Sequence, residues 1–222
     1  MFYFDEFNGY KILKSDYLKD INAFFTTKGQ FPFNENLNKI GVRTVTPNQT
    51  HSDNIQIVDE RDEYPATDSL IITKSHTLVY LRFADCTPII LYDKMKKIGA
   101  VTHAGWRGTA AGICVKTANK MQEELNCLPE NIIALIGPAI GLCCYEVSSD
   151  VKEACLKTVS DRSGLYLEKN IDLKSINARQ LEEAGIKKID ICPYCTSCNN
   201  DLFYSYRKEN GTQERHYAAL ML

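Results

Sequence analysis

Two histidines and one cysteine occupy positions where a folded chain can bring distant side chains together. His51 lies in the polar segment NQTHSDN, Cys86 in FADCTP between two apolar segments, and His103 directly after the apolar run IGAVT. A catalytic zinc site commonly uses three protein ligands and leaves a fourth position open, and two imidazoles with one thiolate are suitable donors. Ligands this dispersed have no regular spacing. The residues alone therefore leave open that the three side chains are unrelated and satisfied locally.

The segment AGWRG after His103 could bind an anion. Gly105 and Gly108 permit close approach of the backbone, and the helix expected after them would offer free N–H groups. The planar guanidinium of Arg107 suits a phosphate or a carboxylate. The alternative is an ordinary turn between a strand and a helix, with a surface arginine.

A second group of cysteines, Cys192, Cys195 and Cys198, forms the motif CPYCTSC. This spacing resembles part of a zinc or iron–sulfur site, but no fourth ligand follows from the sequence. Cys143 and Cys144 belong to a different motif, IGPAIGLCCYEV, and the sequence assigns them no functional role. A second metal or redox site is therefore an open alternative to a purely structural function of the motif.

The elements that would position these residues alternate between strands and helices. Short β-branched or aromatic runs bounded by turn residues predict strands at 54–58, 69–73, 78–83, 88–92, 98–102 and 132–137. Apolar residues every three or four positions predict a helix over 108–125. Asp150 and Asp172 are candidate N-terminal caps of two further helices, the second of which is expected to end at Gly185. We expect an α/β (α+β) fold, with one layered domain over 1–222 and a mixed β-sheet flanked by helices.

Composition narrows the class of protein. The chain has 222 residues and a formal net charge of −2, which disfavours a nucleic-acid-binding surface. No apolar run approaches the roughly 20 residues that span a bilayer, and the first residues do not resemble a signal peptide. We therefore expect a cytoplasmic protein. Its nine cysteines are expected to be thiols, metal ligands or small core residues rather than disulfides.

Five motifs together resemble the laccase-domain family, once called multicopper polyphenol oxidases and now described as zinc-dependent purine nucleoside phosphorylases. They are QTHSDNI, ADCTPIILYD, THAGWRGT, IGPAIGLCCYEV and LFYSYR. The resemblance implies a single α/β domain with Zn²⁺ held by His51, Cys86 and His103. It also implies phosphorolysis of adenosine, inosine or methylthioadenosine, with adenosine deamination as a second activity.

For that chemistry we expect Arg107 and Arg207 to contact the substrate anion and Asp85 to orient a neighbour or carry a proton. A four-copper oxidase is disfavoured because four histidines cannot supply its ligands.

The chain departs from the family pattern at two places. The segment after Lys28 looks shortened, and TQER replaces the usual TGR before Arg215. These departures leave two alternatives open. The first is a zinc-containing binding or regulatory protein without turnover. The second is a zinc amidase acting on peptidoglycan precursors, since a zinc-bound water can also attack an amide carbonyl.

Overall fold

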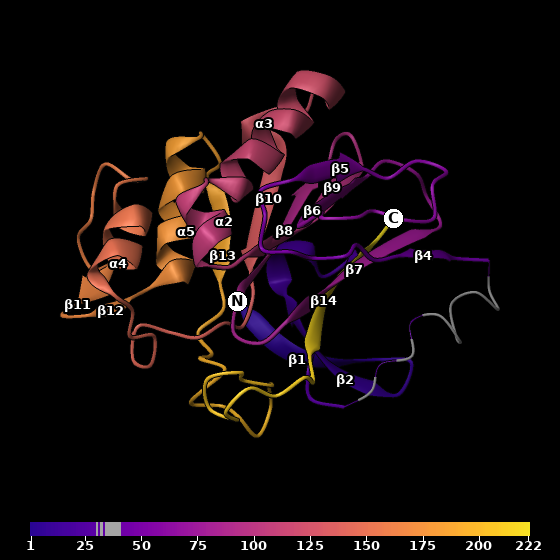
Figure 1. Ribbon diagram of the computed structural model, residues 1–222. Helices are drawn as coiled ribbons and strands as arrows, with labels where there is room; N and C mark the ends of the chain where they lie inside the picture. Colours follow the sequence, from indigo (N-terminus) through magenta and orange to yellow (C-terminus); the bar gives the residue numbers. More distant parts are fainter. Residues whose placement is uncertain (30, 32, 34–40) are drawn as a thin grey trace.

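The computed structural model describes residues 1–29, 31, 33 and 41–222 (Figure 1). Its strands form two six-stranded sheets and one small hairpin. The first sheet is antiparallel except at β4, which pairs parallel with β7. Its order is β1 (Phe2–Phe7), β2 (Tyr10–Ser15), β3 (Asn22–Thr26), β14 (His216–Met221), β7 (Thr77–Phe83) and β4 (Arg43–Val45).

The second sheet carries most of the strands that the sequence predicts. Its inner pairs are antiparallel, and the pairs at both edges are parallel. Its order is β13 (Lys188–Ile191), β10 (Ile132–Ile136), β8 (Thr87–Asp93), β9 (Ile98–Ala104), β6 (Ser69–Ile72) and β5 (Ile55–Ile57). All six predicted strands are present, five of them in this sheet and one, β7, in the other.

Two apolar cores hold three layers together. Side chains such as Leu81 and Leu220 of the first sheet pack against Ile90 of the second, between the sheets. On the other face of the second sheet, Ile89 and its neighbours contact the helices. The residues of β8, β9 and β10 are all buried because both faces of these strands are covered, which explains their continuous apolar runs.

Four helices form the third layer in the part of the chain that the structure describes, and in Figure 1 they lie together on one side of the second sheet. Helix α4 packs with α2, α5 and the hairpin β11–β12 around a smaller apolar cluster. The bounds are α2 (Trp106–Ala110), α3 (Ile113–Leu125), α4 (Ser149–Leu156) and α5 (Leu173–Glu183), with β11 (Tyr166–Leu167) and β12 (Asn170–Ile171) in the hairpin.

The expectation of one mixed sheet was wrong, because there are two. The first sheet is assembled from residues 2–26 at one end of the chain and 216–221 at the other, and β14 pairs with both β3 and β7. Such long-range pairing leaves no local pattern in the sequence. The mixed α/β class is confirmed, whereas a single domain over 1–222 stays a prediction.

Helix ends follow the sequence in part. The carboxylate of Asp172 accepts a hydrogen bond from the N–H of Ser175, so it caps α5 as expected. Gly185, at a φ of 93°, closes the other end, where the N–H of Ile186 donates to the carbonyl of Leu181. The prediction that Asp150 caps a helix was wrong. Helix α4 starts at Ser149, so Ser148 is at the N-cap position and Asp150 lies in the first turn.

The helix expected over 108–125 is two helices, since Gly112 adopts a left-handed φ of 70° between α2 and α3. Among the described residues, no helix is both long and apolar enough to cross a membrane.

Candidate metal centre and substrate cavity

The three predicted ligands come together at one end of the second sheet, where strands β8 and β9 meet the loop between β4 and β5. Cys86 directly precedes β8, and His103 lies within β9, one residue before its end, rather than after it. His51 lies on the loop between β4 and β5. The ligand atoms of all three residues lie within 4.8 Å of one another, and the two imidazole centroids are 4.8 Å apart. Antiparallel pairing of Pro88 with His103 explains how residues 17 positions apart become neighbours.

Asp68 supports this group, and sequence reasoning missed it. The side chain is fully buried, and its Oδ1 lies 2.8 Å from Nδ1 of His103. The same carboxylate accepts backbone N–H bonds from Thr50, His51 and Ser52 at 3.2, 3.1 and 2.7 Å. Asp68 therefore fixes both the loop that carries His51 and the ring of His103. An ionised carboxylate can only accept, so Nδ1 of His103 carries the proton and Nε2 is the nitrogen available to a metal.

The electrostatics of the site favour a thiolate at Cys86. Burial alone would raise the pKa of Cys86, but the imidazoles of His103 and His51 lower it to about 6. Burial would likewise raise the pKa of Asp68, but hydrogen bonds from His103 and Ser52 lower it to about 2. Against its own burial, His103 has a pKa raised to about 9 by Cys86 and Asp68. A thiolate is the form of cysteine that binds metals.

Gly105 allows the backbone to pass close to the ligands. A Cβ at this position would lie 2.9 Å from Sγ of Cys86 and 3.3 Å from the ring of His51. The close approach of the backbone at Gly105 is therefore to the side chains of Cys86 and His51, and an anion at the AGWRG segment stays a prediction.

The donor set fits a zinc ion. Two nitrogens and one sulfur converge from three separate segments, one imidazole is oriented by a buried carboxylate, and the group borders open space. A site with three protein donors leaves a coordination position for water or substrate, which is the arrangement of catalytic rather than structural zinc.

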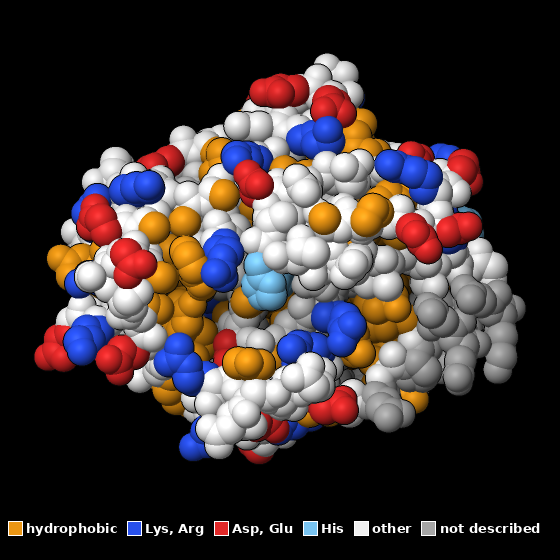
Figure 2. Space-filling view, in the orientation of Figure 1, with side chains coloured by type: hydrophobic (Ala, Val, Ile, Leu, Met, Phe, Trp, Pro, Cys, Tyr) orange, Lys and Arg blue, Asp and Glu red, His pale blue; other side chains and the backbone are white. Residues whose placement is uncertain are grey.

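Two cavities meet at these residues, and both are bordered by His51, Cys86 and Arg215. The larger has a volume of about 430 Å³, which is within the usual range for small-molecule sites. Its walls combine aromatic and aliphatic side chains with arginine, and they include Ile140, Tyr145, Leu173, Tyr206 and Arg207. The smaller, of about 200 Å³, is more polar and is lined by Gln49, Arg82 and His103 among others. Figure 2 shows a hollow in this face of the molecule, bordered by basic side chains and a histidine.

Asp85 and Arg207 lie together at the larger cavity. Asp85 accepts hydrogen bonds from Oγ1 of Thr196 at 2.6 Å and from the backbone N–H of Arg207 at 2.8 Å. The guanidinium of Arg207 lies over the ring of Tyr145, 5.5 Å from its centroid. Asp85 therefore joins two segments of the cavity wall.

Arg107 is placed differently from the sequence expectation. Its guanidinium lies 4.3 Å from the centroid of the Trp106 ring, and among the described side chains it borders neither cavity. Helix α2 has only five residues, so it offers a weak dipole to an anion. Arg82 and Arg215 border the smaller cavity instead. Arg215 stands in the altered TQER segment, whereas no motif in the sequence singles out Arg82.

Lys28, at the other departure, forms an ion pair with Glu209 at 2.8 Å. The segment that follows it, which the sequence comparison with the family pattern predicts to be shortened, lies largely outside the described residues.

A carboxylate-oriented histidine beside a thiol, at the base of a cavity in a mixed α/β fold, defines a candidate metal-dependent enzyme site. The family described as multi-copper polyphenol oxidoreductase laccase matches residues 33–222, and the chain belongs to that family.

Relatives and solved structures agree with this assignment. A purine nucleoside phosphorylase of Clostridium acetobutylicum is 34% identical over 175 residues, 78% of this chain and 74% of the relative. A human purine nucleoside phosphorylase is 30% identical over 88% of this chain and half of its own length. The crystal structure of YlmD from Geobacillus stearothermophilus superposes with a TM-score of 0.86, at 29% identity and 98% coverage of both chains.

Proposed function

We propose that the chain is a zinc-dependent purine nucleoside phosphorylase whose zinc ligands are His51, Cys86 and His103. The observation that carries the proposal is the convergence of these three donors at the base of a cavity of about 430 Å³. The substrates would be adenosine, inosine or methylthioadenosine together with phosphate, and the products a free base and a ribose 1-phosphate type sugar. The names of the curated relatives support this reaction class.

The cavity offers separate places for the two substrates. Ile140, Leu173 and the ring of Tyr145 suit a planar purine, and Arg207 above Tyr145 could contact the nucleoside. Arg82 and Arg215 line the smaller polar cavity beside His51, where a phosphate would be held close to the sugar. Arg107 stays a candidate anion contact, which it could reach by leaving the Trp106 ring.

Positive charge develops on the sugar as the glycosidic bond breaks, so the residues must hold phosphate near the anomeric carbon and stabilise the departing base. A zinc ion bound here would act as a Lewis acid towards a polar group of the substrate. Asp68 keeps His103 in one tautomer, and Asp85 is the candidate proton carrier in the cavity wall. Asp85 also keeps the backbone of Arg207 in place by accepting a hydrogen bond from its N–H.

A product assay tests the proposal. Zinc-loaded protein is incubated with each nucleoside in the presence and absence of phosphate, and free base, sugar phosphate and inosine are measured. Phosphate-dependent release of base and sugar phosphate is expected. The Cys86→Ala variant should lose this activity and the zinc of this site while keeping its fold, whereas Cys127→Ala, a buried thiol outside the site, should retain both.

The same assay, with a second incubation in which a muramyl precursor replaces the nucleoside, separates the alternatives. Inosine formed from adenosine without phosphate would add the deaminase activity. Zinc retention without turnover of any nucleoside would favour a binding or regulatory protein, and release of an amino acid from a muramyl precursor would favour an amidase. Either of the last two results, without phosphorolysis, contradicts the proposal. A cytoplasmic location stays part of the proposal.

A further inference from the structure

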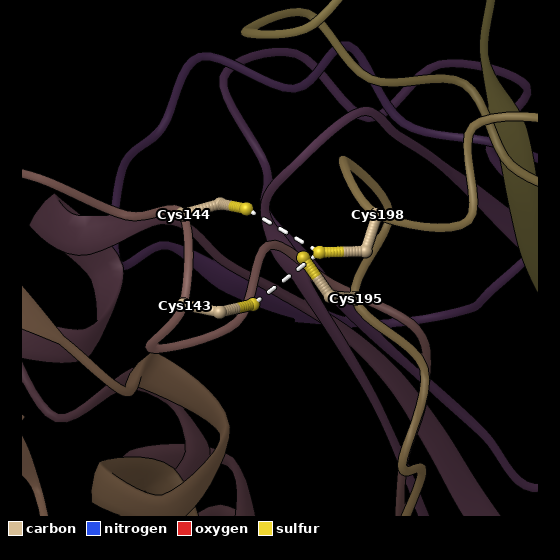
Figure 3. A group of neighbouring side chains, drawn as sticks. All are labelled: Cys143, Cys144, Cys195 and Cys198. Carbon is tan, nitrogen blue, oxygen red and sulfur yellow. Dashed lines mark hydrogen bonds between the residues drawn. The ribbon is translucent and has the colours of Figure 1, made fainter.

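Four cysteines that the proposed reaction does not use converge at the surface near the substrate cavity (Figure 3). Cys143 and Cys144 lie on the turn after β10, and Cys195 and Cys198 lie on the turn after β13. All four sulfur atoms lie within 4.8 Å of one another. Cys192, the first cysteine of the CPYCTSC motif, lies outside this group and is buried in the core between the sheets.

The fold explains why the two turns meet. Strands β10 and β13 pair in parallel, so the chain leaves both at the same edge of the sheet. Beyond the strands, Ala139 forms a bridge to Cys195, and the N–H of Thr196 donates to the carbonyl of Ala139 at 3.1 Å. The N–H of Gly141 donates to Sγ of Cys195 at 3.2 Å. A backbone N–H directed at a cysteine sulfur supports a thiolate there.

Gly141 has little room for a side chain. A Cβ at this position would lie 3.3 Å from Cβ of Cys195 and 3.5 Å from Sγ of Cys143. The turn therefore passes close to the sulfur atoms because residue 141 is a glycine.

The spacing of the sulfurs fits one tetrahedral metal ion. With a Zn–S bond of about 2.3 Å, the sulfurs of a tetrahedral site lie about 3.8 Å apart. Sγ of Cys198 lies 3.5 Å from Sγ of Cys143 and 3.5 Å from Sγ of Cys144. A disulfide would join Cys198 to only one of these two equally distant partners, at about 2.05 Å, and would leave the remaining thiols crowded against it. In a multi-iron cluster the thiolates bind different iron ions and stand further apart.

We propose that Cys143, Cys144, Cys195 and Cys198 bind a second zinc ion in a closed, structural site. Four protein sulfurs leave no position for substrate, which is the pattern of structural rather than catalytic zinc. The site is distinct from the His51–Cys86–His103 group, and it does not depend on the proposed phosphorylase activity.

The position of this site gives the zinc a function. Tyr145, which follows Cys144, lines the larger cavity. Thr196, which follows Cys195, donates its hydroxyl to Asp85. The second zinc would therefore hold the turn that precedes Tyr145 against the turn whose Thr196 binds Asp85, without touching the substrate.

Metal content of matched variants tests the proposal. Full-length wild-type protein, purified without chelators and dialysed, is expected to retain two zinc ions per chain by elemental analysis. Cys195→Ser/Cys198→Ser and Cys86→Ala should each retain one. Cys192→Ala, a change in the same motif but outside the group, should retain two. An undiminished zinc content in Cys195→Ser/Cys198→Ser, or complete loss of zinc from Cys86→Ala, overturns the second site.

A spectroscopic measurement avoids dependence on a variant that fails to fold. In Cys86→Ala loaded with Co²⁺, the absorption spectrum is expected to show intense thiolate-to-cobalt charge transfer and the ligand-field bands of tetrahedral sulfur coordination. Bands typical of nitrogen or oxygen ligands overturn the proposal. So does an intact mass of the wild type that lacks two hydrogens and regains them on reduction, because that marks a disulfide. Iron as the retained metal would also contradict it.

The two proposals fail separately. Wild-type protein with two zinc ions and no phosphorolysis contradicts only the proposed function. Full activity in wild-type protein that holds a single zinc ion contradicts only the second site.

Discussion

Replacing Asp68 by asparagine tests whether the buried carboxylate organises the metal centre. Asparagine keeps the size of the side chain but removes the charge and turns one acceptor into a donor. Asp68 accepts from three backbone N–H groups, from the hydroxyl of Ser52 and from His103, so an amide cannot satisfy all of them.

The magnitude follows from the pKa of Asp68. A shift from 3.8 to about 2 corresponds to about 2 kcal/mol of stabilisation of the folded state. Because the folded-state pKa is lowered, this stabilisation is present at neutral pH and is lost as the pH falls from about 4 towards 2. Asp68→Asn should therefore lower the free energy of unfolding by about 2 kcal/mol at neutral pH. Loss of the partner that orients His103 should also weaken zinc binding about 10- to 100-fold.

Chelator competition on zinc-loaded protein measures the affinity, and Cys86→Ala defines the part of the signal that belongs to this site. Denaturant titration measures the free energy of unfolding. Asp93→Asn is the matched control, since Asp93 is also fully buried and accepts two backbone N–H bonds, from Met95 and Lys96, at the far end of β8. It should lose stability but keep its zinc affinity. Equal zinc affinity in Asp68→Asn and wild type would refute the reasoning.

Three further predictions concern the site and the core. Gly105→Ala should weaken zinc binding by displacing Sγ of Cys86, which a new Cβ would approach to 2.9 Å; chelator competition would show no change if the backbone can shift instead. Arg215→Ala should raise KM for phosphate more than KM for the nucleoside, because Arg215 borders the smaller cavity. Its effect on KM for phosphate should also exceed that of Arg107→Ala, because Arg107 stacks on Trp106. Steady-state kinetics with each substrate varied in turn measure both KM values, and equal changes in the two, or in the two variants, would contradict this prediction. His216 is fully buried, and burial lowers its pKa to about 3. Between about pH 6.5 and pH 3 this imidazole is therefore protonated in the unfolded chain but neutral in the folded chain. Its contribution to the free energy of unfolding should fall by about 2 kcal/mol from pH 7 to pH 5, and His216→Phe should remove that part of the pH dependence.

Local pattern predicted the parts of the fold that depend on local physics. The apolar runs of β8, β9 and β10 are strands because both faces of each are covered, and Asp172 and Gly185 mark the ends of α5 through their own backbone and capping preferences. Apart from strand β7, the first sheet was not predicted, since β14 finds its partners β3 and β7 about 190 and 140 residues away. The pattern of apolar residues within each of these strands does not indicate which distant strand it pairs with.

The sequence by itself determined the donor types and the family motifs, and from them the candidate ligands His51, Cys86 and His103. Only the tertiary structure decided which other residues join them. Asp68 carries no motif, yet its carboxylate is brought by β6 beside His103 on the neighbouring strand β9. Cys143 and Cys144 had no role until the parallel pair β10–β13 brought them to Cys195 and Cys198. Arg107, prominent in its motif, is turned towards Trp106. Residue type limits what chemistry a side chain can do, whereas long-range strand pairing and packing set the distances at which that chemistry becomes available.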